Sequence, residues 1–111
     1  MSSYTDLTVV VPAHNEEESI AALLTRIAAA LPGARILVAD DGSDDNTAAV
    51  AARFEGVAVL QLARGGQGRA VYEGIQAAGT PLVATIDADL QNDPADLARL
   101  YEKHGEGWDI V

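Results

Sequence analysis

The chain contains no cysteine, and it has only one phenylalanine, one tryptophan and one methionine among its 111 residues. The absence of cysteine excludes a disulfide framework, thiol chemistry and any cysteine-ligated zinc or iron–sulfur site. No apolar run approaches the roughly 18 consecutive residues that a membrane-spanning helix needs. The first residues, MSSYTDLT, have neither a basic region nor an apolar stretch, so they predict no signal peptide. We therefore expect a soluble, cytoplasmic chain.

Basic residues are also scarce. The chain has 7 lysines and arginines against 17 aspartates and glutamates, which gives a formal net charge of −10. This negative charge disfavours nucleic acid or an anionic membrane surface as a partner of the chain as a whole. Much of the 49% hydrophobic content is alanine, which buries little surface. The length and composition predict a single domain, residues 1–111, with one small core.

Short apolar runs alternate with helical windows along the whole chain. The pattern predicts strands at residues 7–11 (ended by Pro12), 35–39, 57–62, 81–86 and 108–111, and helices at residues 17–31, 47–54, 67–78 and 94–104. Alternating strands and helices favour a mostly parallel sheet, with right-handed crossovers that place helices on both faces. The strands are continuous apolar runs, as is typical when both faces of a sheet are covered. We predict an α/β fold.

Ten of the 17 carboxylates lie in three short stretches, and each stretch directly follows a predicted strand. The stretches are residues 16–18, 40–45 and 87–93. Loops that follow parallel strands emerge at one edge of the sheet, which is where ligands bind in such folds. Carboxylates gathered at one edge repel one another unless a divalent cation offsets their charge. The sequence therefore favours a cation-dependent site at this edge.

The acidic stretches differ in how well a structural role explains them. Residues 16–18 suit the first turn of a helix through the helix dipole, and Asp44 and Asp45 suit turn or cap positions. Asp87 and Asp89 alternate at the end of a predicted strand, so their side chains point the same way. Two such oxygen ligands suit Mg²⁺ or Mn²⁺ bridging to a diphosphate.

Residues 65–70, with the sequence GGQGRA, lie between the third predicted strand and its helix. A glycine-rich turn at a helix N-terminus lets a phosphate approach closely. The segment does not match a dinucleotide-binding fingerprint, because Val71 stands where the third glycine belongs. Arg69 is the basic residue that we expect to meet an anionic ligand there.

Four segments, in order along nearly the whole chain, resemble the motifs of family 2 glycosyltransferases, whose GT-A fold is Rossmann-like and binds nucleotide sugars. Residues 9–17 resemble the opening VVIPxxNEE of that family, and residues 40–47 resemble DDGSxDxT. Residues 66–74 are similar to GxGxAxxxG. Residues 87–94 are close to DADLQxxP, a form typical of dolichyl- and polyprenyl-phosphate mannosyl- and glucosyltransferases.

The resemblance implies transfer of a sugar from a UDP- or GDP-sugar donor to an acceptor, which in this subgroup is a polyprenyl or dolichyl phosphate. It implies that this chain supplies the donor site and the metal site, with Mg²⁺ or Mn²⁺ as cofactor. The implied donor-binding residues are Pro12, His14, Glu16, Ala39, Asp41, Arg69, Asp87, Ala88 and Asp89. The implied metal ligands are Asp89 and Gln91.

In the family, the general base and the acceptor-binding part lie beyond the position of Val111, and many relatives add membrane-associated helices. The chain thus resembles the donor-binding half of a truncated GT-A domain, and we assign no catalytic base. We expect the full-length relative at the cytoplasmic face of the membrane. A homo-oligomer or the C-terminal half would cover the open edge of the sheet. The alternative function is an inactive donor-binding or regulatory fragment.

Two other α/β classes fit less well. A phosphorylation-dependent receiver domain needs an acidic pair after its first strand and a lysine late in its sheet. Here the acidic pair follows the second predicted strand, and the only lysine, Lys103, falls in a predicted helix. A phosphatase with paired aspartates at a strand end needs threonine or valine where Gln91 stands, together with a downstream lysine.

Overall fold

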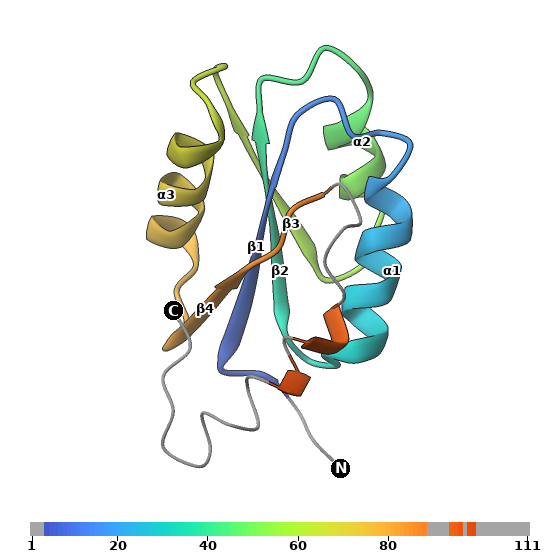
Figure 1. Ribbon diagram of the computed structural model, residues 1–111, viewed down its shortest axis with the longest axis vertical. Coiled ribbons are helices and arrows are strands. Elements are labelled where there is room, and N and C mark those ends of the chain that lie inside the picture. The colour runs from blue at the N-terminus through green and yellow to red at the C-terminus, as the bar shows by residue number, and fades with distance from the viewer. Residues whose placement is uncertain (1–3, 89–93, 97, 100–111) are drawn as a thin grey trace.

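The computed structural model describes residues 4–88, 94–96 and 98–99, which contain a four-stranded parallel sheet flanked by helices. Figure 1 shows the strands β1 (Leu7–Ala13), β2 (Arg35–Asp41), β3 (Val57–Leu62) and β4 (Leu82–Thr85), and the helices α1 (Ile20–Ala30), α2 (Thr47–Ala52) and α3 (Gln67–Ala77). The strand order is β3-β2-β1-β4. The prediction of an α/β fold with a parallel sheet is confirmed. Residues 94–96 and 98–99 are helical, and the predicted strand 108–111 lies outside the described residues.

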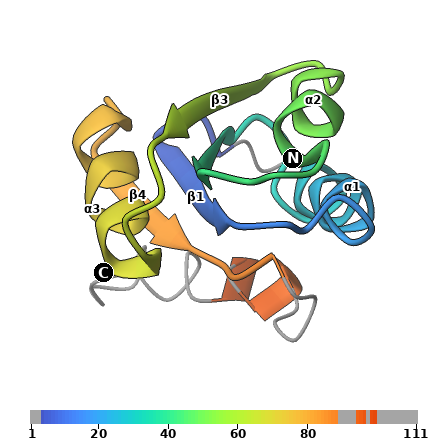
Figure 2. The same cartoon turned by 90° about the horizontal axis from the view of Figure 1, so that it is seen from above.

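Helices cover both faces of the sheet, as Figure 2 shows, with α1 and α2 on one side and α3 on the other. The spacing of apolar residues explains how α1 packs: Ile20, Leu23, Leu24 and Ile27 share one face of the helix and are buried against the sheet. On the other side, α3 lies close to β1 because Gly74 has no side chain. A Cβ at this position would lie 2.5 Å from Cγ1 of Val10.

Two strands extend beyond their predicted ends, and the prediction that Pro12 ends the first strand is wrong. Pro12 lies within β1 and stands in register with Ala39 of β2. The carbonyl of Val10 accepts a hydrogen bond from Ile86, so the backbone groups of Val10 point toward β4. Because backbone groups alternate in direction along a strand, those of Pro12, two residues further on, also point toward β4. β4 pairs with β1 only as far as Val10. Within the described part of the chain, no strand needs the N–H group that proline lacks.

The first helix begins three residues later than predicted, at Ile20 rather than Glu17. Glu17 donates its backbone N–H to the Asp45 carboxylate, with N and Oδ2 3.3 Å apart. The Ser19 hydroxyl contacts the carbonyl oxygen of Ala88, and the Ser19 backbone N–H donates to the carbonyl oxygen of Glu16 at 3.1 Å. These contacts hold residues 17–19 as a turn. No helix within the described residues combines the length and apolarity that crossing a membrane requires.

Candidate functional site

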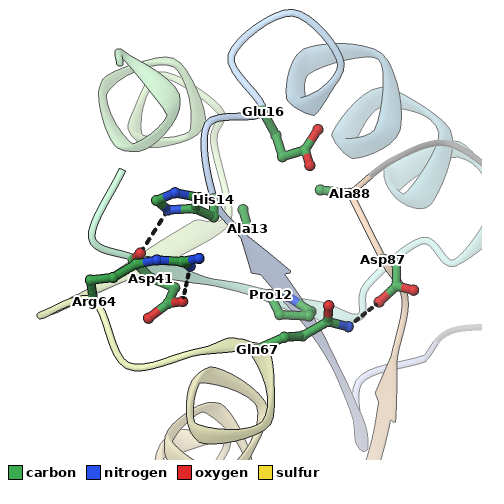
Figure 3. A pocket seen from close by; sticks show the side chains of 9 residues that line it. All are labelled: Pro12, Ala13, His14, Glu16, Asp41, Arg64, Gln67, Asp87 and Ala88. Carbon is green, nitrogen blue, oxygen red and sulfur yellow. Dashed lines mark hydrogen bonds and ion pairs between the residues drawn. The ribbon is translucent and has the colours of Figure 1, made fainter. Parts of the chain in front are cut away.

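A cavity of about 250 Å³ opens at the carboxyl edge of the sheet, where the loops after the strands meet. Figure 3 shows its lining: Pro12, Ala13, His14, Glu16, Asp41, Arg64, Gln67, Asp87 and Ala88. These residues come from the ends of β1 and β2, from the loops that follow β1, β3 and β4, and from the start of α3. The fold thus brings together side chains that lie far apart in the sequence.

The β1–α1 loop holds His14 in one tautomer. Nδ1 of His14 lies 2.9 Å from the carbonyl oxygen of Asp41, and a carbonyl only accepts, so Nδ1 donates. The Oδ1 atom of Asn15 accepts the backbone N–H of Asp44 at 2.8 Å, which turns its amide nitrogen toward His14. That nitrogen lies 3.3 Å from Nε2 of His14, which therefore accepts. In this arrangement His14 donates through Nδ1 and accepts through Nε2.

Further hydrogen bonds fix the loop that carries Glu16. The backbone N–H of Glu16 donates to Oγ1 of Thr47 at 2.8 Å, which joins the loop to the start of α2. The Ser19 hydroxyl oxygen lies 2.8 Å from the carbonyl oxygen of Ala88 and 3.0 Å from Oε2 of Glu16. Its single proton is shared among these two acceptors and the carbonyl oxygen of Glu16, 3.4 Å away. Ser19 therefore connects the β1–α1 loop to the end of β4.

The buried carboxylate of Asp41 anchors the β3–α3 loop. Oδ1 accepts the backbone N–H of Gly65 at 2.8 Å, and Oδ2 accepts that of Gly66 at 2.9 Å. Oδ2 also lies 2.6 Å from Nη1 of Arg64. The Gly65 N–H, with the Gly66 N–H and the Arg64 guanidinium, outweighs desolvation and holds the pKa of Asp41 below its ordinary value. The adjacent carboxylate, Asp40, accepts a hydrogen bond from the Ser43 hydroxyl.

Three lining residues were not predicted from the sequence: Ala13, Arg64 and Gln67. Among the residues that line the cavity in the described part of the chain, Arg64 alone carries a permanent positive charge. Its side chain is 59% exposed. Nε2 of Gln67 donates to Oδ1 of Asp87 at 2.8 Å, which bridges the start of α3 and the end of β4. The glycine-rich segment after β3 was the available signal for both polar residues.

The structure gathers six of the predicted donor-site residues around the cavity: Pro12, His14, Glu16, Asp41, Asp87 and Ala88. It places the other two described ones elsewhere. Ala39 is fully buried in the cluster of Val10 and Ala70, beneath α3. Arg69 does not line the cavity, because its Nη1 atom donates to the carbonyl oxygen of Ala63 at 2.9 Å and folds back over its own loop.

In the second acidic stretch, Asp45 has a structural role. Oδ1 of Asp45 accepts the backbone N–H of Thr47 at 3.0 Å as well as the Thr47 hydroxyl, at the start of α2. Desolvation acts to raise the pKa of Asp45, but the hydrogen bonds from Thr47 and Glu17 outweigh it and lower the pKa. Asp45 thus stabilises the turn that precedes α2, which is one of the structural roles its position suggested.

Within the described residues, no group of three or more histidine, aspartate or glutamate side chains is placed to hold a metal ion. The predicted ligands Asp89 and Gln91 lie outside the described residues. Asp87 and Ala88, just before them, line the cavity. The metal site therefore stays a prediction for the segment that follows Ala88.

Solved structures that match this fold include glycosyltransferases of the GT-A type. Glucosyl-3-phosphoglycerate synthase from Mycobacterium tuberculosis, in complex with Mn²⁺, UDP and glucosyl-3-phosphoglycerate, matches with a TM-score of 0.77 and 26% identity, over 90% of this chain and 39% of that enzyme. A mannosyltransferase from Pyrobaculum calidifontis, in complex with GDP-Man and Mn²⁺, matches with a TM-score of 0.77 and 25% identity, over 87% of this chain and 31% of that one.

The chain belongs to glycosyl transferase family 2, whose family model matches residues 8–111. An uncharacterized glycosyltransferase of Mycobacterium tuberculosis is 49% identical over 105 residues, which cover 95% of this chain and 46% of that protein. The undecaprenyl-phosphate 4-deoxy-4-formamido-L-arabinose transferase of Klebsiella pneumoniae is 43% identical over 115 residues, 95% of this chain and 35% of that enzyme. The chain thus spans less than half the length of these relatives.

Proposed function

We propose that this chain is the donor-binding part of a metal-dependent glycosyltransferase that transfers a sugar from a UDP- or GDP-sugar. The observation that carries the proposal is the cavity at the carboxyl edge, where six of the residues implied by the family resemblance come together. The solved GT-A relatives were crystallised with UDP or GDP-Man and with Mn²⁺, which supports a nucleotide donor and a divalent cation.

In this proposal the nucleobase and ribose lie against Pro12, His14 and Glu16, at the end of β1 and in the loop after it. Asp41 holds the β3–α3 loop that forms the opposite wall, and Arg64 brings a positive charge to that wall. Asp87 and Ala88 lie on the side of the ribose and diphosphate. Asp89 and Gln91 would hold Mg²⁺ or Mn²⁺, which offsets negative charge on the departing nucleoside diphosphate.

The acceptor in this proposal is a polyprenyl phosphate. The support comes from the DADLQ segment at residues 87–91 and from relatives that are named as undecaprenyl-phosphate transferases. The residues of this chain then bind and orient the donor, and the general base lies in a part of the enzyme beyond residue 111. A membrane-facing location of the full-length enzyme follows from a lipid acceptor.

Calorimetry with UDP and GDP, each with and without Mg²⁺ or Mn²⁺, tests donor binding. We expect metal-dependent binding that Asp89→Ala abolishes. Asp44→Asn is the matched control, because Asp44 is exposed and does not line the cavity, so this variant should bind as the parent chain does. Binding that does not depend on metal, or equal binding by the Asp89→Ala variant, contradicts the proposed donor and metal site.

The second candidate, a donor-binding fragment without turnover, is separated from the first by a transfer assay. The chain is incubated with UDP- or GDP-sugar, Mg²⁺ and a polyprenyl phosphate, and release of nucleoside diphosphate is measured. We expect weak or no release from this chain alone, because it spans less than half of its relatives. Release that depends on both the acceptor and Asp89 would show instead that residues 1–111 suffice for transfer.

A further inference from the structure

Gln67 is a cavity residue to which the family resemblance assigned no role. It is the first residue of α3, its side chain is exposed, and its amide nitrogen lies 2.8 Å from Oδ1 of Asp87. The hydrogen bond joins the loop after β3 to the end of β4. Because both residues line the cavity, the contact forms part of its wall.

The contact with Asp87 decides which end of the Gln67 amide faces a ligand. A carboxylate accepts hydrogen bonds, so the amide must turn its NH₂ group toward Asp87. Figure 3 shows the result: the amide nitrogen of Gln67 points to Asp87, and its oxygen points into the cavity. Gln67 therefore offers a hydrogen-bond acceptor to anything bound there.

Acceptors and donors are unevenly distributed around the cavity. The Gln67 amide oxygen and the Asp87 carboxylate form one acceptor-rich wall, which binds hydroxyl or N–H groups. Arg64, which is held by Asp41, offers only donors and binds carbonyl or phosphate oxygens. A ligand that satisfies both walls needs hydroxyl groups at one end and oxygen acceptors at another. A ribonucleotide has this distribution, because its sugar carries two neighbouring hydroxyls and its base and phosphates carry acceptor oxygens.

We propose that Gln67 is a specificity-determining residue that, together with Asp87, recognises the ribose hydroxyls of the nucleotide. The inference rests on the proposed function, because it requires a nucleotide in this cavity. Gln67 accepts a hydrogen bond from one hydroxyl through Oε1, while its NH₂ group keeps the Asp87 carboxylate beside the other. A site that hydrogen-bonds a hydroxyl discriminates against an analogue without it, since its own acceptor is then left unpaired.

The test compares UDP and GDP with their 2′-deoxy and 3′-deoxy counterparts, by calorimetry in the presence of Mg²⁺. The parent chain is expected to bind the ribonucleotides more tightly. The Gln67→Met variant keeps the length of the side chain and removes its hydrogen bonding. It should lower the preference for one ribonucleotide over its deoxy analogue by about 3- to 10-fold, which is the range for one neutral hydrogen bond. Binding of the analogue that lacks the recognised hydroxyl should barely change.

Gln61→Met is the matched control, because Gln61 is an exposed glutamine of β3 that does not line the cavity. It should leave the preference unchanged. A ribose-to-deoxyribose preference that is the same in Gln67→Met and in the parent chain overturns the inference and leaves the proposed function intact. Equal weakening of ribo- and deoxynucleotides also overturns it, because Gln67 would then act only on the loop. If the parent chain binds no nucleoside diphosphate, the proposed function fails as well.

Discussion

Replacing Asp41 with asparagine tests how the cavity wall is held in place. The substitution keeps the shape of the side chain but turns one acceptor oxygen into an NH₂ group. In the parent chain, Oδ1 accepts from Gly65, and Oδ2 accepts from Gly66 and Arg64. Only one of the two backbone N–H groups keeps its acceptor in the variant, so the β3–α3 loop loses one of its two anchors.

The size of the effect follows from the burial of each partner. A fully buried backbone N–H that loses its partner costs about 1–3 kcal/mol. The lower part of this range applies here, because Asp41 is buried but Gly65 is exposed and Gly66 is half-buried. The contribution of Arg64 is smaller, about 0–1 kcal/mol, because its side chain is 59% exposed and can turn to water. We expect Asp41→Asn to lower the free energy of unfolding by about 1–2 kcal/mol. For a domain of this size, that corresponds to a fall in Tm of roughly 5–15 °C.

The same carboxylate makes stability depend on acid. The Gly65 N–H, with Gly66 and Arg64, lowers the pKa of Asp41 in the folded chain below its value in the unfolded chain. A carboxyl group with a lowered folded pKa stabilises the fold above its unfolded pKa, about 3.9. That contribution is lost as the pH falls through the folded pKa. The free energy of unfolding should therefore decrease below about pH 5. It should decrease less steeply in Asp41→Asn, where only other groups such as Asp45 still contribute.

Urea denaturation of the parent chain, Asp41→Asn and Arg64→Met at pH 7, 5, 4 and 3 measures these effects. Arg64→Met keeps both backbone hydrogen bonds to Asp41 and should cost no more than about 1 kcal/mol at pH 7. If Arg64→Met destabilises the chain as much as Asp41→Asn does, the ion pair and not the glycine N–H groups holds the loop. An unchanged acid dependence in Asp41→Asn refutes the assignment of that dependence to this carboxylate.

Two glycine substitutions test the close contacts behind the cavity. Gly42→Ala should lower the free energy of unfolding by more than Gly56→Ala does. A Cβ at Gly42 would lie 2.7 Å from the backbone nitrogen of Arg64, whereas a Cβ at Gly56 meets nothing within 4 Å. Both glycines have positive φ, so the difference in urea denaturation isolates the clash, and equal losses would refute it. Gly74→Ala should lower the free energy of unfolding by about 1–3 kcal/mol, because the added methyl group overpacks against Val10. Val10→Ala in the same chain should recover part of that loss in thermal unfolding. No recovery would argue against this contact.

The fold could be predicted in class and element order because its strands and helices are strongly periodic. The boundaries that the sequence missed depend on tertiary structure. A proline normally interrupts a strand, because it has no N–H group to donate to a neighbouring strand. Pro12 is tolerated because β4 pairs with β1 only as far as Val10. Residues 17–19 have the composition of a first helical turn, yet their hydrogen-bonding groups go to Asp45 and Ala88. In each case, a segment distant in the sequence outweighed the local conformational preference.

The site residues that could be predicted from the sequence are those whose position depends only on where a strand ends. His14, Asp41 and Asp87 directly follow or end apolar strands, so their place at the edge could be inferred from the sequence. Arg64 and Arg69 could not be told apart in this way. Both flank the glycine-rich segment, and the choice depends on Asp41, which pairs with Arg64, and on the turn that lets Arg69 reach a carbonyl of its own loop.

The strand order β3-β2-β1-β4 has a consequence for how this chain could come to bind a ligand at all. The chain winds outward from β1 through β2 to β3 and then crosses back to the other side of β1, so the connections on the two sides of β1 lie on opposite faces. The loop after β1 leads to α1 and the loop after β3 leads to α3 on the opposite face, and the cavity lies where these two loops diverge. The hollow is therefore produced by connectivity and needs no bulky side chains to frame it. That suits a chain rich in alanine and poor in aromatics, and it leaves the loop residues free to change ligand preference while the sheet stays the same.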